Sequence, residues 1–372
     1  MMAGDSRNSR SSFDPSLFKD PRLAHELVGA IGRFMPDRPV TLMEVCGTHT
    51  VSIARSGIRD LMPPHVRLAS GPGCPVCVTS NRDIDTVIAL ARVPGVEIAT
   101  FGDMTRVPGS TSSLLAEQAS GAHITIVYSP LDALALAQKH PERQIVFVGV
   151  GFETTTPLVA MAVKRAAAAG LSNFSVFVAH KNMPGALEAI VADPDLAVDA
   201  LILPGHVSTI IGAEPYRFLA ERYGIPGVIT GFEPVDILQG IAMIARQLHE
   251  GRAQIEIAYA RGVRPEGNQV ALAAIDEVFE TCTAVWRGLG RIEGSGYRLR
   301  EEFSDFDAVK RFDPQIEPTV EPRGCRCGDV LRAHMAPNEC PLFAKACSPE
   351  NPIGPCMVSS EGSCAAYYRY YR

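Results

Sequence analysis

The stretch Gly71-Pro72-Gly73-Cys74-Pro75-Val76-Cys77 places two cysteines on a glycine-rich turn. It follows the apolar run at residues 66–69 and precedes a helical pattern at residues 83–92, so we expect the turn to leave the end of a strand. The glycines allow close backbone approach, and the prolines stiffen the turn. A Cys-x-x-Cys turn can close into a disulfide, bind a metal ion as part of a functional or structural site, or hold two inert thiols; the motif alone leaves these alternatives open.

On both sides of this turn, short apolar runs alternate with helical patterns. Continuous apolar strands alternating with helices predict an α/β protein whose parallel sheets are covered on both faces. The expected strands lie at residues 40–45, 66–69, 96–100, 124–128, 145–150, 174–178, 200–203 and 227–230. The expected helices between them lie at residues 84–92, 114–120, 131–139, 157–169, 185–192 and 216–223.

The length of 372 residues predicts more than one domain. We expect two doubly wound parallel-sheet domains facing a cleft, at residues 38–142 and 143–233. After residue 234 the pattern changes to helices at 235–249 and 269–281 and then to a loop-rich passage at 287–322. Residues 13–37 and 234–372 are expected to form a third lobe of helices with a cysteine-rich C-terminal segment, and residues 1–12 a disordered start.

Composition and charge exclude several classes of protein. The formal net charge is −6 and the sequence has no basic stripe with interleaved aromatic residues, so we expect no nucleic-acid binding. No apolar run approaches the ~20 residues that span a bilayer, so we expect no membrane insertion. Residues 1–12 do not resemble a secretory signal, which predicts a cytoplasmic protein. In such a chain, the ten cysteines indicate metal binding or redox chemistry more than a disulfide scaffold.

The candidate site residues follow the carboxyl ends of predicted strands, where open α/β sheets place their ligands. Cys46 and His49 share one such loop, and the cysteines of the opening stretch lie on an equivalent loop. We expect Cys46 to be an accessible thiolate ligand beside a base, with a buried cysteine and a capping histidine as the alternative. Soft thiolates suit iron, zinc or copper(I). His206 follows a later strand, and its alternative is a satisfied loop histidine.

The C-terminal cysteines give the most specific pattern. Four of them, separated by 14, 6 and 16 residues, provide ligands for zinc or for an iron–sulfur cluster. The remaining two indicate a redox-active dithiol beside a cluster, which a structural zinc site would not need. The four are Cys325, Cys340, Cys347 and Cys364, and the remaining two are Cys327 and Cys356.

Five motifs, in order along the chain, are similar to those of the HypD family of [NiFe]-hydrogenase maturation proteins. The resemblance covers residues 18–368. The motifs are Met43-Glu44-Val45-Cys46-Gly47-Thr48-His49-Thr50, the opening stretch, Gly151-Phe152-Glu153-Thr154-Thr155-Thr156-Pro157, Leu203-Pro204-Gly205-His206-Val207-Ser208-Thr209-Ile210-Ile211-Gly212 and Met357-Val358-Ser359-Ser360-Glu361-Gly362.

The resemblance implies a scaffold on which the Fe(CN)2CO unit of the hydrogenase is assembled, in complex with the chaperone HypC and with cyanide supplied by HypE. It implies that Cys46, Cys74 and Cys77 lie at or near the iron. It implies that the third lobe ends in a [4Fe-4S] segment with Cys325, Cys340, Cys347 and Cys364 as ligands. Cys327 and Cys356 would be the adjacent dithiol. Whether the chain is an enzyme stays open. The other hypotheses are an iron–sulfur thiol/disulfide reductase and a zinc-stabilised binding module.

Overall fold

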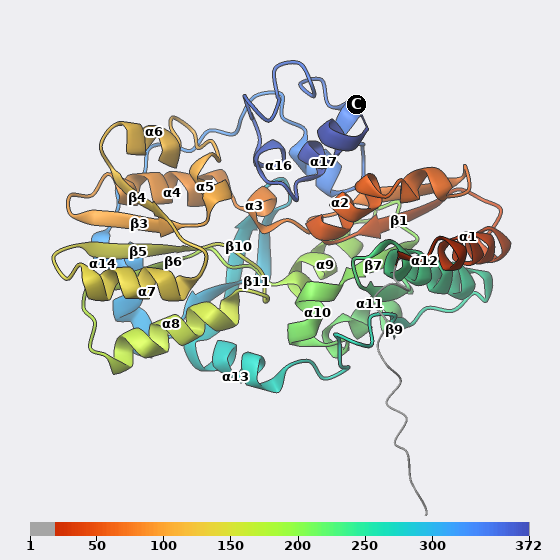
Figure 1. The fold of residues 1–372 in the computed structure, drawn as a ribbon, viewed down its shortest axis with the longest axis horizontal. Helices are drawn as coiled ribbons and strands as arrows, with labels where there is room; N and C mark the ends of the chain where they lie inside the picture. Colours follow the sequence, from red (N-terminus) through yellow and green to blue (C-terminus); the bar gives the residue numbers. More distant parts are fainter. Residues whose placement is uncertain (1–18, 372) are drawn as a thin grey trace, which may run out of the picture.

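The computed structural model describes residues 19–371, so the expected disordered start at residues 1–12 and residues 13–18 of the expected third lobe lie outside the described part. Figure 1 shows two parallel sheets side by side, with the C-terminal lobe over the junction between them. The strands are β1 Val40–Glu44, β2 Val66–Ser70, β3 Val96–Thr100, β4 His123–Ile126, β5 Gln144–Gly149, β6 Phe174–Val178, β7 Ala200–Pro204, β8 Gly227–Thr230, β9 Ile255–Ile257, β10 Phe279–Trp286 and β11 Gly290–Leu299.

The helices lie between the strands and in the C-terminal lobe. The α-helices are α1 Pro21–Phe34, α2 Gly47–Arg55, α3 Pro75–Val78, α4 Asn81–Ala91, α5 Gly102–Thr105, α6 Leu114–Ala119, α7 Pro130–Lys139, α8 Thr156–Ala168, α9 Met183–Val191, α10 Gly205–Ile211, α11 Arg217–Glu221, α12 Pro234–His249, α13 Gln269–Val278, α14 Ala308–Phe312, α15 Cys327–Leu331, α16 Pro355–Val358 and α17 Ser363–Tyr370. The 3₁₀ helices are η2 Ile58–Leu61, η3 Glu214–Tyr216, η4 Glu301–Phe306 and η5 Pro337–Glu339.

The first sheet has the strand order β2-β1-β7-β8-β9 and is buried on both faces. Successive side chains of a strand point to opposite faces. Leu42 and Ile202 therefore pack with α1, α2 and α12 in one core cluster, while Met43 and Leu201 pack with α9, α10 and α11 in another. Two-sided burial explains why these strands are apolar runs without alternation.

The second sheet has the order β4-β3-β5-β6 and follows the same rule. Ile98 and Val146 face α4 and α6, whereas Ala99 and Phe147 face α7 and α8. All pairings in both sheets are parallel, which confirms the predicted α/β class. The eight predicted strands are all present within two residues of their expected bounds.

The membership of the sheets differs from the expected division at residues 38–142 and 143–233. Each of these blocks contributes two strands to each sheet, because β7 returns to pair with β1 after the whole second sheet has been built. Leu42 lies opposite Ala200 in this pairing. Parallel strands are joined by crossovers of any sufficient length, and a buried apolar strand carries no signal for its neighbour. The sequence pattern therefore located the strands but did not specify which of them pair.

The region after α12 also differs from expectation. The predicted helix at 269–281 ends at Val278, and the chain continues as β10, which pairs with β11 in an antiparallel hairpin. The strand β11 lies in the passage that we expected to be loop-rich. The sequence did not predict this strand, because its glycines and arginines interrupt the alternation of apolar and polar residues. The hairpin lies between the two sheets in Figure 1 and carries the fully buried Trp286 into the core cluster at their junction.

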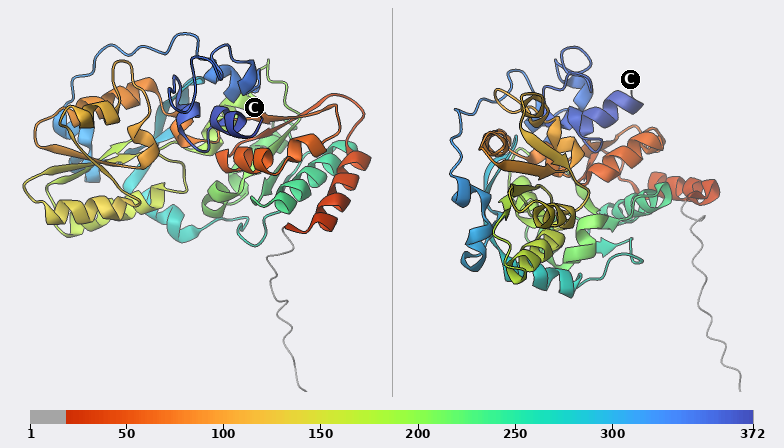
Figure 2. Two further views of the ribbon diagram at one scale, coloured as in Figure 1. Left: turned by 45° about the horizontal axis from the view of Figure 1, so that its top comes forward. Right: turned by 60° about the vertical axis from the view of Figure 1, so that its left-hand side comes forward.

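The carboxyl ends of both sheets meet in this junction. Phe152, which follows β5, stacks against Trp286, with ring centroids 5.8 Å apart. Cys74, Cys77 and Cys356 belong to the same buried cluster. Helix α16 contacts α3, and α17 contacts α2, so the C-terminal lobe closes over the loops that follow β1 and β2. Both views of Figure 2 show this lobe seated over the same edge.

Candidate metal centre

The loops that follow β1 and β2 are in direct backbone contact, as their equivalent positions predict. Gly71 N–H donates to the carbonyl of Glu44 at 2.8 Å, and Gly47 N–H donates to the carbonyl of Gly73 at 3.1 Å. A Cβ atom on Gly73 would lie 2.2 Å from the backbone nitrogen of Cys46, so only glycine allows this approach. The Cys-x-x-Cys turn is therefore fixed against the start of α2, where Cys46 lies.

Cys46 is less accessible than expected, because it is only 7% exposed. Burial and the carboxylate of Glu361 raise the pKa of its thiol to about 12, against the opposing effect of backbone hydrogen bonds from Thr48 and His49. The thiol is neutral in this environment. A metal cation is the partner that can convert it into a thiolate ligand.

His49 is fully buried, and Nε2 lies 2.9 Å from the carbonyl oxygen of Gly231 and 2.8 Å from Oγ1 of Thr230. Burial lowers its pKa to about 4, so the ring is neutral. Its Nδ1 atom has no hydrogen-bond partner within residues 19–371. His206 is exposed and stacks on Phe232 at 3.8 Å between centroids, and His49 stacks on the same ring at 4.8 Å. The two predicted histidines, from α2 and α10, are therefore joined through Phe232.

Glu361 is the site residue to which sequence reasoning gave no role. Its carboxylate accepts a 2.7 Å hydrogen bond from Thr48 Oγ1, and a Cβ on Gly47 would lie 2.6 Å from its backbone oxygen. It also raises the pKa of His206, which burial lowers. The signal was present in the C-terminal Met357–Gly362 motif, but only the fold brings that motif to Cys46.

The Cys-x-x-Cys turn and the C-terminal dithiol form a continuous sulfur series of Cys74, Cys77, Cys356 and Cys327. Cys77 N–H donates to Cys74 Sγ at 3.2 Å, and the sulfurs of Cys327 and Cys356 lie 3.1 Å apart. The pKa of Cys77 is raised well above its usual value by burial and by hydrogen bonding with Cys356 and Cys74. Hydrogen bonding with Cys327 and Cys77 lowers the pKa of Cys356, which lies in the middle of the series.

A cavity in the C-terminal lobe is lined by all six C-terminal cysteines and by apolar side chains such as Leu342 and Phe343. Burial raises the pKa of Cys325 to about 11 and that of Cys364 well above its usual value, with neighbouring cysteines adding to both shifts. Thiols held neutral in an apolar cavity fit an iron–sulfur cluster, which binds thiolates and supplies the compensating positive charge.

No three His, Cys, Asp or Glu side chains in residues 19–371 are gathered closely enough to bind a single metal ion. The ligands of a four-iron cluster bind four different irons, so their sulfurs need not converge on one point. The sulfur-lined cavity is thus compatible with metal or iron–sulfur binding. Within the same residues all ten cysteines are free thiols, and Cys282 lies on β10 opposite Gly296, half-buried.

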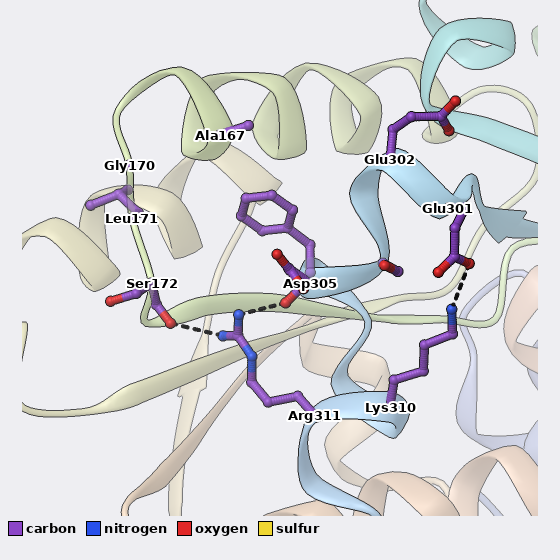
Figure 3. Close-up of a pocket in the computed structure, with 11 residues that line it drawn as sticks. Ala167, Gly170, Leu171, Ser172, Glu301, Glu302, Asp305, Lys310 and Arg311 are labelled. Carbon is purple, nitrogen blue, oxygen red and sulfur yellow. Dashed lines mark hydrogen bonds and ion pairs between the residues drawn. The ribbon is translucent and has the colours of Figure 1, made fainter.

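A surface pocket away from the cysteines lies between α8 and η4 (Figure 3). Arg311 in this pocket donates to the carbonyl oxygens of Ser172 at 3.0 Å and Phe174 at 3.1 Å, and Lys310 pairs with Glu301 at 3.1 Å. These cations are satisfied by the protein itself, and the pocket contains none of the predicted site residues. We therefore interpret it as a structural junction of η4 and α14 with the second sheet.

Comparison with known proteins assigns this arrangement to a family. The family model described as "HypD: Hydrogenase formation hypA family" matches residues 22–371. The "Hydrogenase maturation factor HypD" of Rhodobacter capsulatus is 48% identical over 366 residues, which is 95% of this chain and 97% of that protein. The protein of the same name from Escherichia coli K12 is 44% identical over 340 residues, which is 91% of each.

The matched residues include both cysteine groups and all the loops described above. The chain belongs to the HypD family of hydrogenase maturation factors. In residues 19–371 no helix is both long enough and apolar enough to span a membrane.

Proposed function

We propose that this protein is the scaffold on which the Fe(CN)2CO unit of [NiFe] hydrogenases is assembled. Cys46 would bind the cargo iron, with Cys74 and Cys77 beside it and His49, His206 and Glu361 around it. The observation that carries the proposal is the sulfur series, because it runs from the Cys-x-x-Cys turn, whose Gly73 carbonyl accepts from Gly47 N–H in the Cys46 loop, to the six-cysteine cavity. An iron carrying cyanide and carbon monoxide is a soft centre and favours thiolate ligands.

Cyanide transfer from a sulfur carrier requires two electrons. When the S–CN bond of the carrier breaks, cyanide binds the iron and the carrier sulfur takes up a proton. The electrons come from Cys74 and Cys77, whose thiols lose two protons and form a disulfide. One of these protons goes to the carrier sulfur and the other to solvent. Because Cys74 caps α3 and accepts from Cys77 N–H, the two residues are held on one turn for this step.

The C-terminal dithiol can then restore the turn by thiol–disulfide exchange. Cys356 attacks the sulfur of Cys77, and Cys74 leaves as a thiolate. Cys327 next attacks Cys356, and Cys77 is released, which leaves a Cys327–Cys356 disulfide. Cys325, Cys340, Cys347 and Cys364 would hold the proposed [4Fe-4S] cluster, which would supply one-electron chemistry next to that disulfide. The lowered pKa of Cys356 favours its role as the attacking thiolate.

The proposed partners are the chaperone HypC and the cyanide donor HypE, and the proposed location is the cytoplasm. We expect HypC to dock near Cys46 and to bury ~1,200–2,000 Å² in total, as transient specific complexes do. Crosslinks confined to the cysteine lobe would contradict this placement.

A thiol/disulfide reductase is the second candidate, favoured by the 3.1 Å contact between Cys327 and Cys356. Such an enzyme would use the same sulfur series but would bind no iron at Cys46. A zinc-stabilised binding module would need neither the dithiol nor the series. Iron and sulfide analysis of anaerobically purified protein separates the candidates: the scaffold is expected to hold four irons with sulfide, and additional iron with HypC bound.

The decisive variant is Cys46→Ala. We expect it to fold, to keep the cluster, and to fail in hydrogenase maturation, because no thiolate remains for the cargo iron. Since Cys46 is buried, a stability loss of ~1 kcal/mol is expected as well. Cys46→Ser, which replaces the thiolate with a hard hydroxyl, is expected to fail too. Active hydrogenase in cells that carry Cys46→Ala would disprove the scaffold mechanism.

A further inference from the structure

Arg287 is a buried cation without hydrogen bonds at the ends of its guanidinium group. It directly follows β10 and is 3% exposed. Neither Nη1 nor Nη2 has a hydrogen-bond partner within residues 19–371. Its ion pair is with Glu321, at 3.5 Å from Nη2 to Oε2, and the Glu321 side chain is 64% exposed. A buried charge with so little compensation is costly, so its position calls for a partner that the side chains do not supply.

The surroundings of Arg287 identify that partner as sulfur. Its backbone N–H donates to the carbonyl of Val78 at 2.8 Å, one residue after Cys77. The next residue, Gly288, packs so tightly on α15 that a Cβ would lie 2.4 Å from Gly328 Cα, beside Cys327. One pocket is lined jointly by Arg287, Cys325 and Cys327. The backbone at Arg287 is therefore anchored between both cysteine groups, and its charge acts on the thiols of Cys325 and Cys356.

The other charged groups of this pocket differ from Arg287 in exposure. Arg326 pairs with Asp329 and its side chain is 54% exposed, and Arg332 is 37% exposed and lies 3.7 Å from the same carboxylate. Their fields are screened by water. Arg287 is the buried cation among the arginines that line this pocket.

We propose that Arg287 sets the reduction potential of the iron–sulfur site by holding a fixed positive charge beside its sulfurs. The inference rests on the proposed cluster. Reduction adds one negative charge to a cluster with four thiolate ligands, and a nearby cation in a low-dielectric interior stabilises the reduced form more than the oxidised form. Arg287 thus raises the potential. Burial has the largest effect on the pKa of Cys325, and hydrogen bonding has the largest effect on the pKa of Cys356. The charge of Arg287 lowers both pKa values.

The test is an EPR-monitored redox titration of the full-length, cluster-loaded protein. Arg287→Gln removes the charge and keeps two N–H donors, and Arg287→Lys keeps the charge. We expect Arg287→Gln to lower the equilibrium constant for cluster reduction about tenfold, a 59 mV shift to lower potential for one electron. Arg287→Lys and the exposed control Arg326→Gln are expected to shift it less than about threefold. An unchanged midpoint in Arg287→Gln would overturn the inference.

Glu321→Gln provides a second control that does not disturb the core. Its side chain is 64% exposed and its carboxylate is screened by water, so this variant, like Arg326→Gln, is expected to shift the equilibrium constant less than about threefold. If Arg287→Gln cannot hold its cluster, Arg287→Lys decides: a tenfold or larger fall in the equilibrium constant with the charge retained refutes the inference. Iron and sulfide content of the unmodified protein is measured first. Absence of a cluster there would refute the proposed function itself, and this inference with it.

Discussion

Replacing Gly73 with alanine is expected to separate the two loops that build the Cys46 site. The added Cβ would lie 2.2 Å from the backbone nitrogen and 2.3 Å from the Cα of Cys46. Ordinary contacts begin near 3.4 Å, so one loop must move by about 1.2 Å, the difference between these distances. Both obstructing atoms are backbone, so no side-chain rotation relieves the overlap.

The expected loss of stability combines two effects. Overpacking costs ~1–3 kcal/mol, and the hydrogen bond from Gly47 N–H to the Gly73 carbonyl, 3.1 Å long, is worth ~0.5–1.5 kcal/mol. We therefore expect the free energy of unfolding to fall by ~2–4 kcal/mol in Gly73→Ala. Cys46 also moves away from Cys74, so we expect hydrogenase maturation to fall while the proposed cluster, whose expected ligands lie in another lobe, is retained.

Gly29→Ala is the matched control. Gly29 lies in the interior of α1, and an added Cβ would meet no atom within 4 Å. Alanine has the higher helix propensity, so this variant is expected to gain ~0.5–1 kcal/mol. Both variants are unfolded in urea under anaerobic conditions, and hydrogenase activity is measured in cells. A Gly73→Ala variant as stable as Gly29→Ala, or fully active in maturation, would refute the close-contact argument.

Three further variants test other parts of the structure. Cys340→Ala should lose the cluster and loosen residues 320–371, since three thiolates leave one iron under-ligated; full iron and sulfide content would contradict this assignment. His180→Phe should flatten the pH dependence of stability. Burial lowers the pKa of His180 to about 3, whereas its pKa in the unfolded chain is ~6.5. The contribution of neutral His180 to the free energy of unfolding is therefore complete above pH ~6.5, and it is lost by up to ~1.4 kcal/mol per pH unit as the pH falls below that value. Urea unfolding at pH 7 and pH 5 measures this, and an unchanged slope would argue against it. Glu361→Gln should lower the pKa of Cys46 and speed its alkylation in iron-free protein, followed by peptide mass mapping; an equal or slower rate would show that this carboxylate does not act on the thiol.

The sequence alone determined the local structure of most of the chain. Apolar runs such as residues 145–150 became strands, and residues 71–74 of the glycine turn became a loop after a strand, because burial on two faces and backbone freedom leave direct signatures. The spacing of the cysteines also divides them into an early group and a C-terminal group. The motifs around Cys46 and His206 carried enough information to point to the family.

Only the tertiary structure decided which elements are neighbours. The pairing of β7 with β1 closes a loop of over a hundred residues, and no local pattern encodes it. The hairpin of β10 and β11 was concealed by its glycines, and it brings Arg287 between Cys77 and Cys327. Cys356 and Glu361 acquire their contacts with Cys77 and Thr48 in the same way. Composition and periodicity indicate whether a residue is buried and in which type of element it lies. They do not indicate which distant segments meet at a site, because that depends on the packing free energy of the whole chain.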